Sequence, residues 1–203
     1  MNVRRGFKEF VTKSFSATLV LLLVSVAWGQ DEKKQPEPES LSVLYYLDSS
    51  DQLVALESPV LHVKHKPRSL GFAGGTTVYV VRGEKSPVRL KAESKPEFVV
   101  RLQGDIDPLE TVQFFHFDLE NGSRVMHVAD FDPFGRVSKL LPNSPPTDFN
   151  AVKQGKSSVK LIPIQTLLPG EYCAMIAKLG QLSQSKTPVY CFGVDADGQK
   201  GSQ

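Results

Sequence analysis

The sequence has little that identifies a chemistry. Only 2 of its 203 residues are cysteine and 1 is tryptophan, and 24 basic side chains balance 22 acidic ones. A formal net charge of +2 gives no electrostatic reason to bind nucleic acid. The two cysteines do not form a C-x-x-C motif, which argues against a thiol oxidoreductase. P-loop, G-x-S-x-G and H-E-x-x-H motifs are absent, so we expect no enzyme and no resident cofactor.

The chain also lacks an apolar run long enough for an ordinary membrane-spanning helix. Its longest run, Phe15–Trp28, has 14 residues, and a span needs about 20. Four basic residues precede this run and the small-x-small triplet Ala27-Trp28-Gly29 ends it, as in a secretory signal peptide. We predict a signal peptide over residues 1–29, cleaved after Gly29, and a secreted or periplasmic protein. The alternative is an uncleaved N-terminal anchor, which would be the chain's only membrane attachment.

The remaining chain divides into three parts by composition. Residues 30–40 (QDEKKQPEPES) are charged and Pro-containing, which predicts a flexible polar linker. Residues 41–195 have the size of a single domain, and the polar residues 196–203 are expected to be a disordered tail. Without residues 1–29 the chain keeps 20 basic and 21 acidic side chains, a net charge of −1. The small excess of positive charge therefore belongs to the predicted signal peptide.

Within the domain, apolar residues alternate with a period of two and turn signals recur every 8–14 residues. This pattern predicts about ten short antiparallel strands in a β-sandwich, immunoglobulin-like or related, with a small β-barrel as the alternative. Residues 147–154 are the one segment expected to form a helical turn. The expected strands cover residues 42–47, 52–57, 60–65, 76–82, 88–91, 97–102, 112–120, 124–131, 158–164, 171–177 and 189–194.

Asn121-Gly122 is the most specific local signal, because Asn-Gly between alternating strands favours a two-residue type I′ hairpin. In that register, positions whose numbers sum to 243 face each other, so His116 would face His127. Directly opposed Cβ atoms lie about 5 Å apart, so the two imidazoles could share zinc or copper, with Asp118 as a third ligand. The alternative is two solvated histidines on a polar face. The opposite face, with Phe115, Phe117, Leu119, Met126 and Val128, is expected to be core.

Cys173 and Cys191 lie on the last two expected strands. An even count in an oxidising compartment predicts a disulfide between them. The bridge would set a register summing to 364, with Tyr172, Ala174 and Ile176 on one apolar face together with Tyr190 and Phe192. The alternative is two buried cysteines that do not touch.

Two further groups of side chains suggest weaker hypotheses. Asp105, Asp107, Asp130 and Asp132 could serve a hydrolase with dispersed carboxylates, although Asp and Asp-Pro are ordinary turn residues. Phe114, Phe131 and Phe134 could form an exposed binding patch, since Phe115 already points into the core. Alternatively, a second sheet covers Phe114, as a sandwich permits.

These observations favour an exported, non-catalytic β-sandwich module that binds another envelope protein or a glycan. The second hypothesis is a periplasmic metal-binding protein that uses His116, His127 and Asp118. The third is the hydrolase. Since fold alone does not determine function, the sequence leaves the three open.

Overall fold

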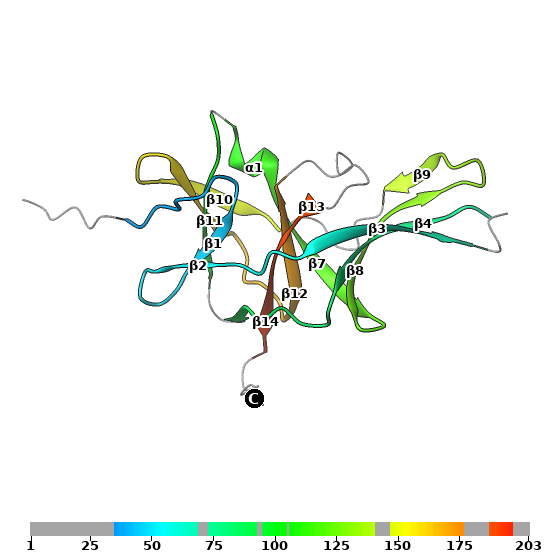
Figure 1. The fold of residues 1–203 in the computed structure, drawn as a ribbon, viewed down its shortest axis with the longest axis horizontal. Helices are drawn as coiled ribbons and strands as arrows, with labels where there is room; N and C mark the ends of the chain where they lie inside the picture. Colours follow the sequence, from blue (N-terminus) through cyan, green and yellow to red (C-terminus); the bar gives the residue numbers. More distant parts are fainter. Residues whose placement is uncertain are drawn as a thin grey trace, which may run out of the picture. The chain divides into compact units, whose positions relative to one another are not determined.

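A computed structural model describes residues 35–68, 73–92, 95–104, 106–140, 147–176 and 187–196 (Figure 1). These residues belong to one unit, 35–203, and the predicted signal peptide lies outside them. The elements are β1 (Leu44–Leu47), β2 (Leu53–Ala55), β3 (Val60–Pro67), β4 (Gly75–Arg82), β5 (Arg89–Lys91), β6 (Glu97–Arg101), α1 (Pro108–Thr111), β7 (Val112–Glu120), β8 (Ser123–Phe131), β9 (Val137–Leu140), β10 (Phe149–Gln154), β11 (Ser158–Pro163), β12 (Gly170–Ile176), β13 (Thr187–Pro188) and β14 (Tyr190–Asp195). In this part of the chain, no helix is long and apolar enough to cross a membrane.

The strands form two sheets, which confirms the predicted all-β sandwich. One sheet has five strands in the order β10-β11-β6-β1-β2. The other has nine, in the order β13-β3-β4-β8-β7-β12-β14-β5, with β9 paired to β8. Neighbouring strands are antiparallel except β14 and β5, which are parallel. The described residues form no closed barrel, so the sandwich is the better of the two predicted architectures.

The nine-stranded sheet is strongly curled. β13 pairs with β3, and a few residues later β14 pairs with β12, so one stretch of chain contacts strands from both halves of the sheet. A first apolar cluster fills the inside of this curl. Its buried members are Leu61, Tyr79, Val81, Phe115, Phe117, Met126, Val128, Ala129, Cys173, Met175, Val189 and Cys191.

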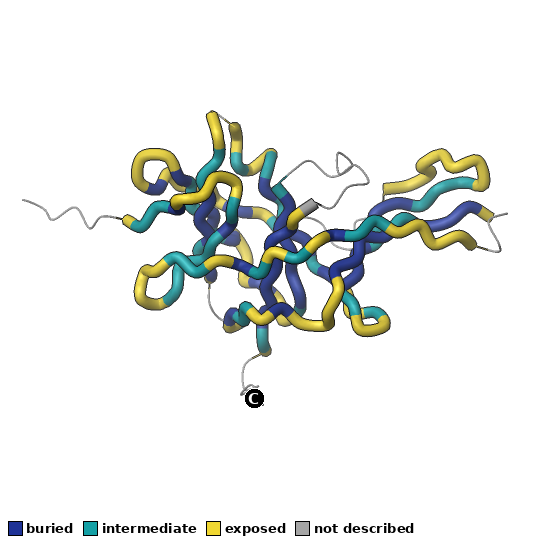
Figure 2. Tube along the Cα trace, in the orientation of Figure 1, coloured by how far each residue is buried: buried dark blue, intermediate teal, exposed yellow. Residues whose placement is uncertain are grey.

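A second apolar cluster lies between the two sheets. It includes Phe98 and Leu161 from the five-stranded sheet and Phe114 and Phe192 from the other. The rings of Phe98 and Phe114 have centroids 4.8 Å apart. β12, β14 and the first part of β7 are therefore buried on both faces, and Figure 2 shows long dark-blue stretches along β12 and β14. The expected apolar face of the last two strands is part of this cluster.

The Asn121-Gly122 turn has the conformation predicted for it. Both residues have positive φ, 48° and 76°, as a type I′ turn requires. Leu119 pairs with Arg124, in the predicted register. Leu119, however, is 56% exposed and not core, while Arg124 is completely buried. The hairpin extends beyond the core at Leu119, and Arg124 is buried by the ion pairs described below.

The structure has strands in segments where none was predicted. Residues 149–154, expected in a helical turn, form the edge strand β10, because β11 supplies an antiparallel partner along its whole length. β9 was not predicted, and all four of its residues are exposed. Residues 35–40 contact the β10–β11 hairpin: the Gln154 side chain donates a 2.6 Å hydrogen bond to the Pro36 carbonyl. That half of the predicted linker is thus in contact with the domain.

Candidate functional site

Of the three predicted metal ligands, the structure places His116 near Asp118, whereas His127 has a different partner. In the described residues, β7 and β8 pair at three positions next to the turn, and this pairing ends before His116 and His127. His116 Nδ1 lies 3.7 Å from Asp118 Oδ1, and its ring packs edge-on against Tyr172. His127 Nε2 lies 2.8 Å from Glu120 Oε1 instead. Within the described part of the chain, no three His, Cys, Asp or Glu side chains are grouped so as to hold a metal ion.

His127 belongs to a small polar chain across the outer face of the curled sheet. Lys66 Nζ donates a 2.8 Å hydrogen bond to Glu120 Oε2, and His127 contacts the other oxygen. The Lys66 ammonium and, after it, His127 hold the pKa of the Glu120 carboxyl below its usual value of 4.5. Each group therefore has a protein partner, and the arrangement is that of a half-exposed ion pair.

The disulfide is present between Cys173 and Cys191, as predicted. The two residues are directly opposed on β12 and β14, and Glu171 is opposed to Gly193 in the register that sums to 364. Both cysteines are completely buried in the cluster inside the curl. The bridge is therefore part of the core and has no exposed sulfur for redox chemistry.

A buried network of charges escaped the sequence analysis. Arg124 donates to both carboxylate oxygens of Glu57, at 2.7 and 2.9 Å, and to the Gly83 carbonyl. Arg89 bonds both Glu171, which is 4% exposed, and Asp195. The Arg89 guanidinium holds the pKa of Asp195 below its usual value of 3.8.

One sequence signal points to this network. The cysteine register places Glu171 opposite Gly193, and the missing side chain leaves space for the Arg89 guanidinium: a Cβ at Gly193 would lie 1.6 Å from Arg89 Nη1. Each of these charges is paired within the protein.

The carboxylates of the hydrolase hypothesis hold turns and side chains in place. Asp107 caps α1 by accepting a hydrogen bond from the Leu109 amide. Asp132 accepts from the Arg136 and Phe134 amides in the β8–β9 turn, which lowers its pKa. Asp130 accepts from Arg68 and Thr76. Asp105 lies outside the described residues.

The predicted aromatic patch is not continuous. Phe114 is 1% exposed because the five-stranded sheet covers it, so its expected exposure is wrong and the alternative of a covering sheet is confirmed. Phe131 is half-buried next to Gly75, and Phe134 is 82% exposed in the β8–β9 turn. Of these three rings, Phe134 alone is mostly exposed.

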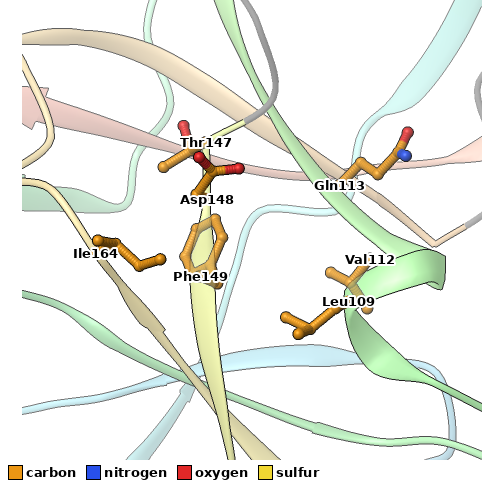
Figure 3. Close-up of a pocket in the computed structure, with 7 residues that line it drawn as sticks. All are labelled: Leu109, Val112, Gln113, Thr147, Asp148, Phe149 and Ile164. Carbon is orange, nitrogen blue, oxygen red and sulfur yellow. The ribbon is translucent and has the colours of Figure 1, made fainter.

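A cavity of about 250 Å³ opens between α1 and the start of β10 (Figure 3). Phe149 stands between Ile164 on one side and Leu109 with Val112 on the other, while Gln113 points away from the Phe149 ring. Leu109 and Ile164 are half exposed, at 48% and 50%. Thr147 and Asp148 form a polar edge.

The sequence reasoning missed this cavity because its walls come from separate segments. Two backbone hydrogen bonds hold the crossing segment in place: the Thr147 amide donates to the Phe114 carbonyl, and the Ile164 amide donates to the Asp148 carbonyl. Thr147 and Asp148 therefore pass from one sheet to the other beside α1. No pattern in the sequence marks such a junction.

The fold defines the chain as a two-sheet, disulfide-bonded β-sandwich with a small apolar cavity at the junction of its sheets. Comparison with protein-family models, with curated proteins and with solved structures found no match.

Proposed function

We propose that the chain is an exported, non-catalytic interaction module, and that the cavity between α1 and β10 binds an apolar side chain of another envelope protein. The observation that carries the proposal is this cavity, with buried Val112 and Phe149 as its floor and half-exposed Leu109 and Ile164 as its rim. Protein interfaces have such apolar centres, into which a partner inserts an anchoring side chain, surrounded by polar groups.

The size and lining of the cavity favour a protein over a glycan. About 250 Å³ lies below the range of roughly 300–1,000 Å³ that is usual for small-molecule pockets, and it suits one large side chain. A sugar would need several convergent polar groups to orient its hydroxyls. The cavity walls are mainly apolar, and the Phe149 ring is too buried, at 8% exposure, to offer a stacking face.

The proposal predicts that Leu109→Glu weakens partner binding. Burying a leucine contributes about 1.5–3 kcal/mol, so its replacement by a charge should raise the Kd at least about tenfold. Leu119→Glu is the matched control, because Leu119 is similarly exposed, at 56%, and belongs to the β7–β8 hairpin. Tagged exported protein would be cross-linked in intact cells, and the Kd of each recovered partner would be measured by calorimetry.

A partner protein lost by Leu109→Glu and kept by Leu119→Glu supports the proposal. Two results would contradict it: equal binding of every partner by both variants, or binding to purified cell-wall glycan that Leu109→Glu abolishes. The second result would assign the cavity to a sugar. Far-UV circular dichroism of both variants tests that the sandwich remains folded.

A further inference from the structure

A second surface lies at the far end of β3, β4, β8 and β9. These four strands run side by side away from β1, β2, β10 and β11, and the exposed yellow segments of Figure 2 mark their ends (Figures 1 and 2). We call this end the tip and define it as residues 64–68, 73–77 and 129–140. The intervening residues 69–72 lie outside the described structure, and their sequence, SLGF, carries no charge.

The pairing of the four strands gives the tip two different faces. Lys66 pairs with Thr76, Thr76 with Asp130, and Asp130 with Lys139, so these residues share one face. The next row, which points to the other face, is Pro67, Gly75 and Phe131. Phe131 pairs with Val137 across an irregularity in the β8–β9 register. Leu140 pairs with Ala129 on that second face. The tip is therefore an amphipathic sheet with one polar, basic face and one apolar face.

The apolar groups of the tip protrude into solvent. Val137 is 64% exposed and Leu140 is 65% exposed, and Phe134 at the apex of the β8–β9 turn is 82% exposed. The Arg136 guanidinium lies over the Phe134 ring, 5.3 Å from its centroid. A lone ring at a turn apex, next to a cation, has the amphipathic form of side chains that sit at a lipid–water interface.

The tip also carries the positive charge of the domain. It has five basic side chains, Lys64, Lys66, Arg68, Arg136 and Lys139, and two acidic ones, an excess of three positive charges. Glu120 of the β7–β8 hairpin pairs with Lys66 and offsets one of these charges. The chain after Gly29 has a net charge of −1, so everything outside the tip amounts to −4. Both acidic groups of the tip are engaged by its own arginines: Arg68 binds Asp130, and Arg136 binds Asp132.

We propose that the tip docks on an anionic lipid surface, with Phe134 and the apolar face in the interface and the lysines beside the headgroups. Charge complementarity carries this choice, because basic groups beside exposed apolar groups bind anionic bilayers more strongly than neutral ones. A protein partner would need a matching hollow for Phe134, whereas a fluid lipid surface accepts a protruding ring of any shape. The proposal is independent of the cavity between α1 and β10.

Tryptophan fluorescence tests the proposal at a single position. Trp28 is the only tryptophan in the sequence, so Trp28→Phe gives a background in which Phe134→Trp is the sole tryptophan. The exported protein, with whatever N-terminus it carries, is mixed with vesicles of phosphatidylglycerol and phosphatidylethanolamine. We expect a blue-shifted emission that bromine-labelled lipid chains quench, and at least tenfold weaker binding to phosphatidylcholine vesicles.

Two matched controls make the result decisive. Leu119→Trp in the same background places the emitter on the β7–β8 hairpin, outside the tip, and its emission should not shift. This control separates docking by the tip from attachment through residues 15–28 alone. Lys139→Glu should weaken binding to the anionic vesicles several-fold, whereas Lys153→Glu, at an exposed lysine of β10, should not.

The proposal is overturned if emission from position 134 is unchanged by anionic vesicles while circular dichroism shows a folded protein. Equal shifts at positions 134 and 119 would also overturn it, because they would report non-specific adsorption. Binding that is indifferent to Lys139→Glu and to 0.5 M salt would contradict the electrostatic part of the argument.

Discussion

At the scale of single residues, Arg124 shows how strongly the three-dimensional context decides a side chain's environment. A strand arginine near a turn is ordinarily expected in solvent. Here it is completely buried, because Glu57 meets its guanidinium in a two-pronged pair and the Gly83 carbonyl accepts a further hydrogen bond. Glu57 lies between β2 and β3, far from Arg124 in the sequence. The pair forms only when the sheet curls.

Arg124→Met is expected to lower the free energy of unfolding by about 3 kcal/mol or more. Removing one member of a buried ion pair costs about 3–5 kcal/mol. Here the remaining charge is mainly that of Glu57, which is partly buried and would lose its partner. Urea unfolding followed by circular dichroism measures the change. Arg136→Met is the control: its side chain is 76% exposed, so its pair with Asp132 should contribute less than about 1 kcal/mol. Equal effects of the two substitutions would refute this account.

At the scale of elements, two turns show that glycines with the same backbone conformation can be required for different reasons. Gly74, before β4, and Gly122, between β7 and β8, have φ of 74° and 76°. A Cβ at Gly122 would meet nothing closer than 3.8 Å, whereas a Cβ at Gly74 would lie 2.0 Å from the Phe131 carbonyl oxygen. Gly122 is therefore needed only for its positive φ, whereas Gly74 also allows the β3–β4 and β8–β9 hairpins to approach closely.

This difference predicts unequal costs for two chemically identical substitutions. Gly122→Ala should destabilise the protein by about 1 kcal/mol, the usual cost of a left-handed conformation for an L-residue. Gly74→Ala adds a clash with backbone that cannot move aside, so we expect about 3 kcal/mol. Chemical denaturation of both variants measures the difference. A Gly74→Ala cost no greater than that of Gly122→Ala would show that the two hairpins are not in contact.

At the scale of the whole molecule, ionisable groups set a pH range of stability. The pKa of Glu120 is held below 4.5 and that of Asp195 below 3.8, so the folded state binds their protons less well than the unfolded chain does. Their contribution is complete above those usual values and is lost as the pH falls through the lower, folded values. Burial raises the pKa of Tyr172 and Tyr190, so alkaline pH destabilises the protein from about pH 10 upwards.

The measurable consequence is a plateau of stability between about pH 5 and pH 9. Urea midpoints recorded from pH 2.5 to pH 10.5 should decline at both ends. Glu120→Gln removes one of the titrating carboxylates, so its acid decline should be shallower than that of the native chain. A Glu120→Gln curve parallel to the native one would show that the Lys66 and His127 contacts do not influence stability.

Alternating apolar residues and turn residues predicted those strands whose structure depends on the local sequence. Residues 112–120 were predicted as a strand with the bounds that β7 has, and Asn121-Gly122 predicted its turn and register. The Cys173–Cys191 bridge was predicted from the even number of cysteines and the expected oxidising compartment. The candidate site was beyond such reasoning, because Leu109, Phe149 and Ile164 come from three segments. For the same reason, the sequence register suggested that His116 faces His127, although β7 and β8 diverge before them.

By itself the sequence determined the all-β class, most of the strands, the Asn-Gly turn and the disulfide, because alternation, turn residues and cysteines act between near neighbours in the chain. Only the tertiary structure decided which faces are covered. The second sheet buries Phe114, the curl buries Arg124 with Glu57, and the pairing of β3, β4, β8 and β9 gathers the basic and apolar residues of the tip. These arrangements depend on contacts between residues tens of positions apart, which no periodicity within a single strand encodes.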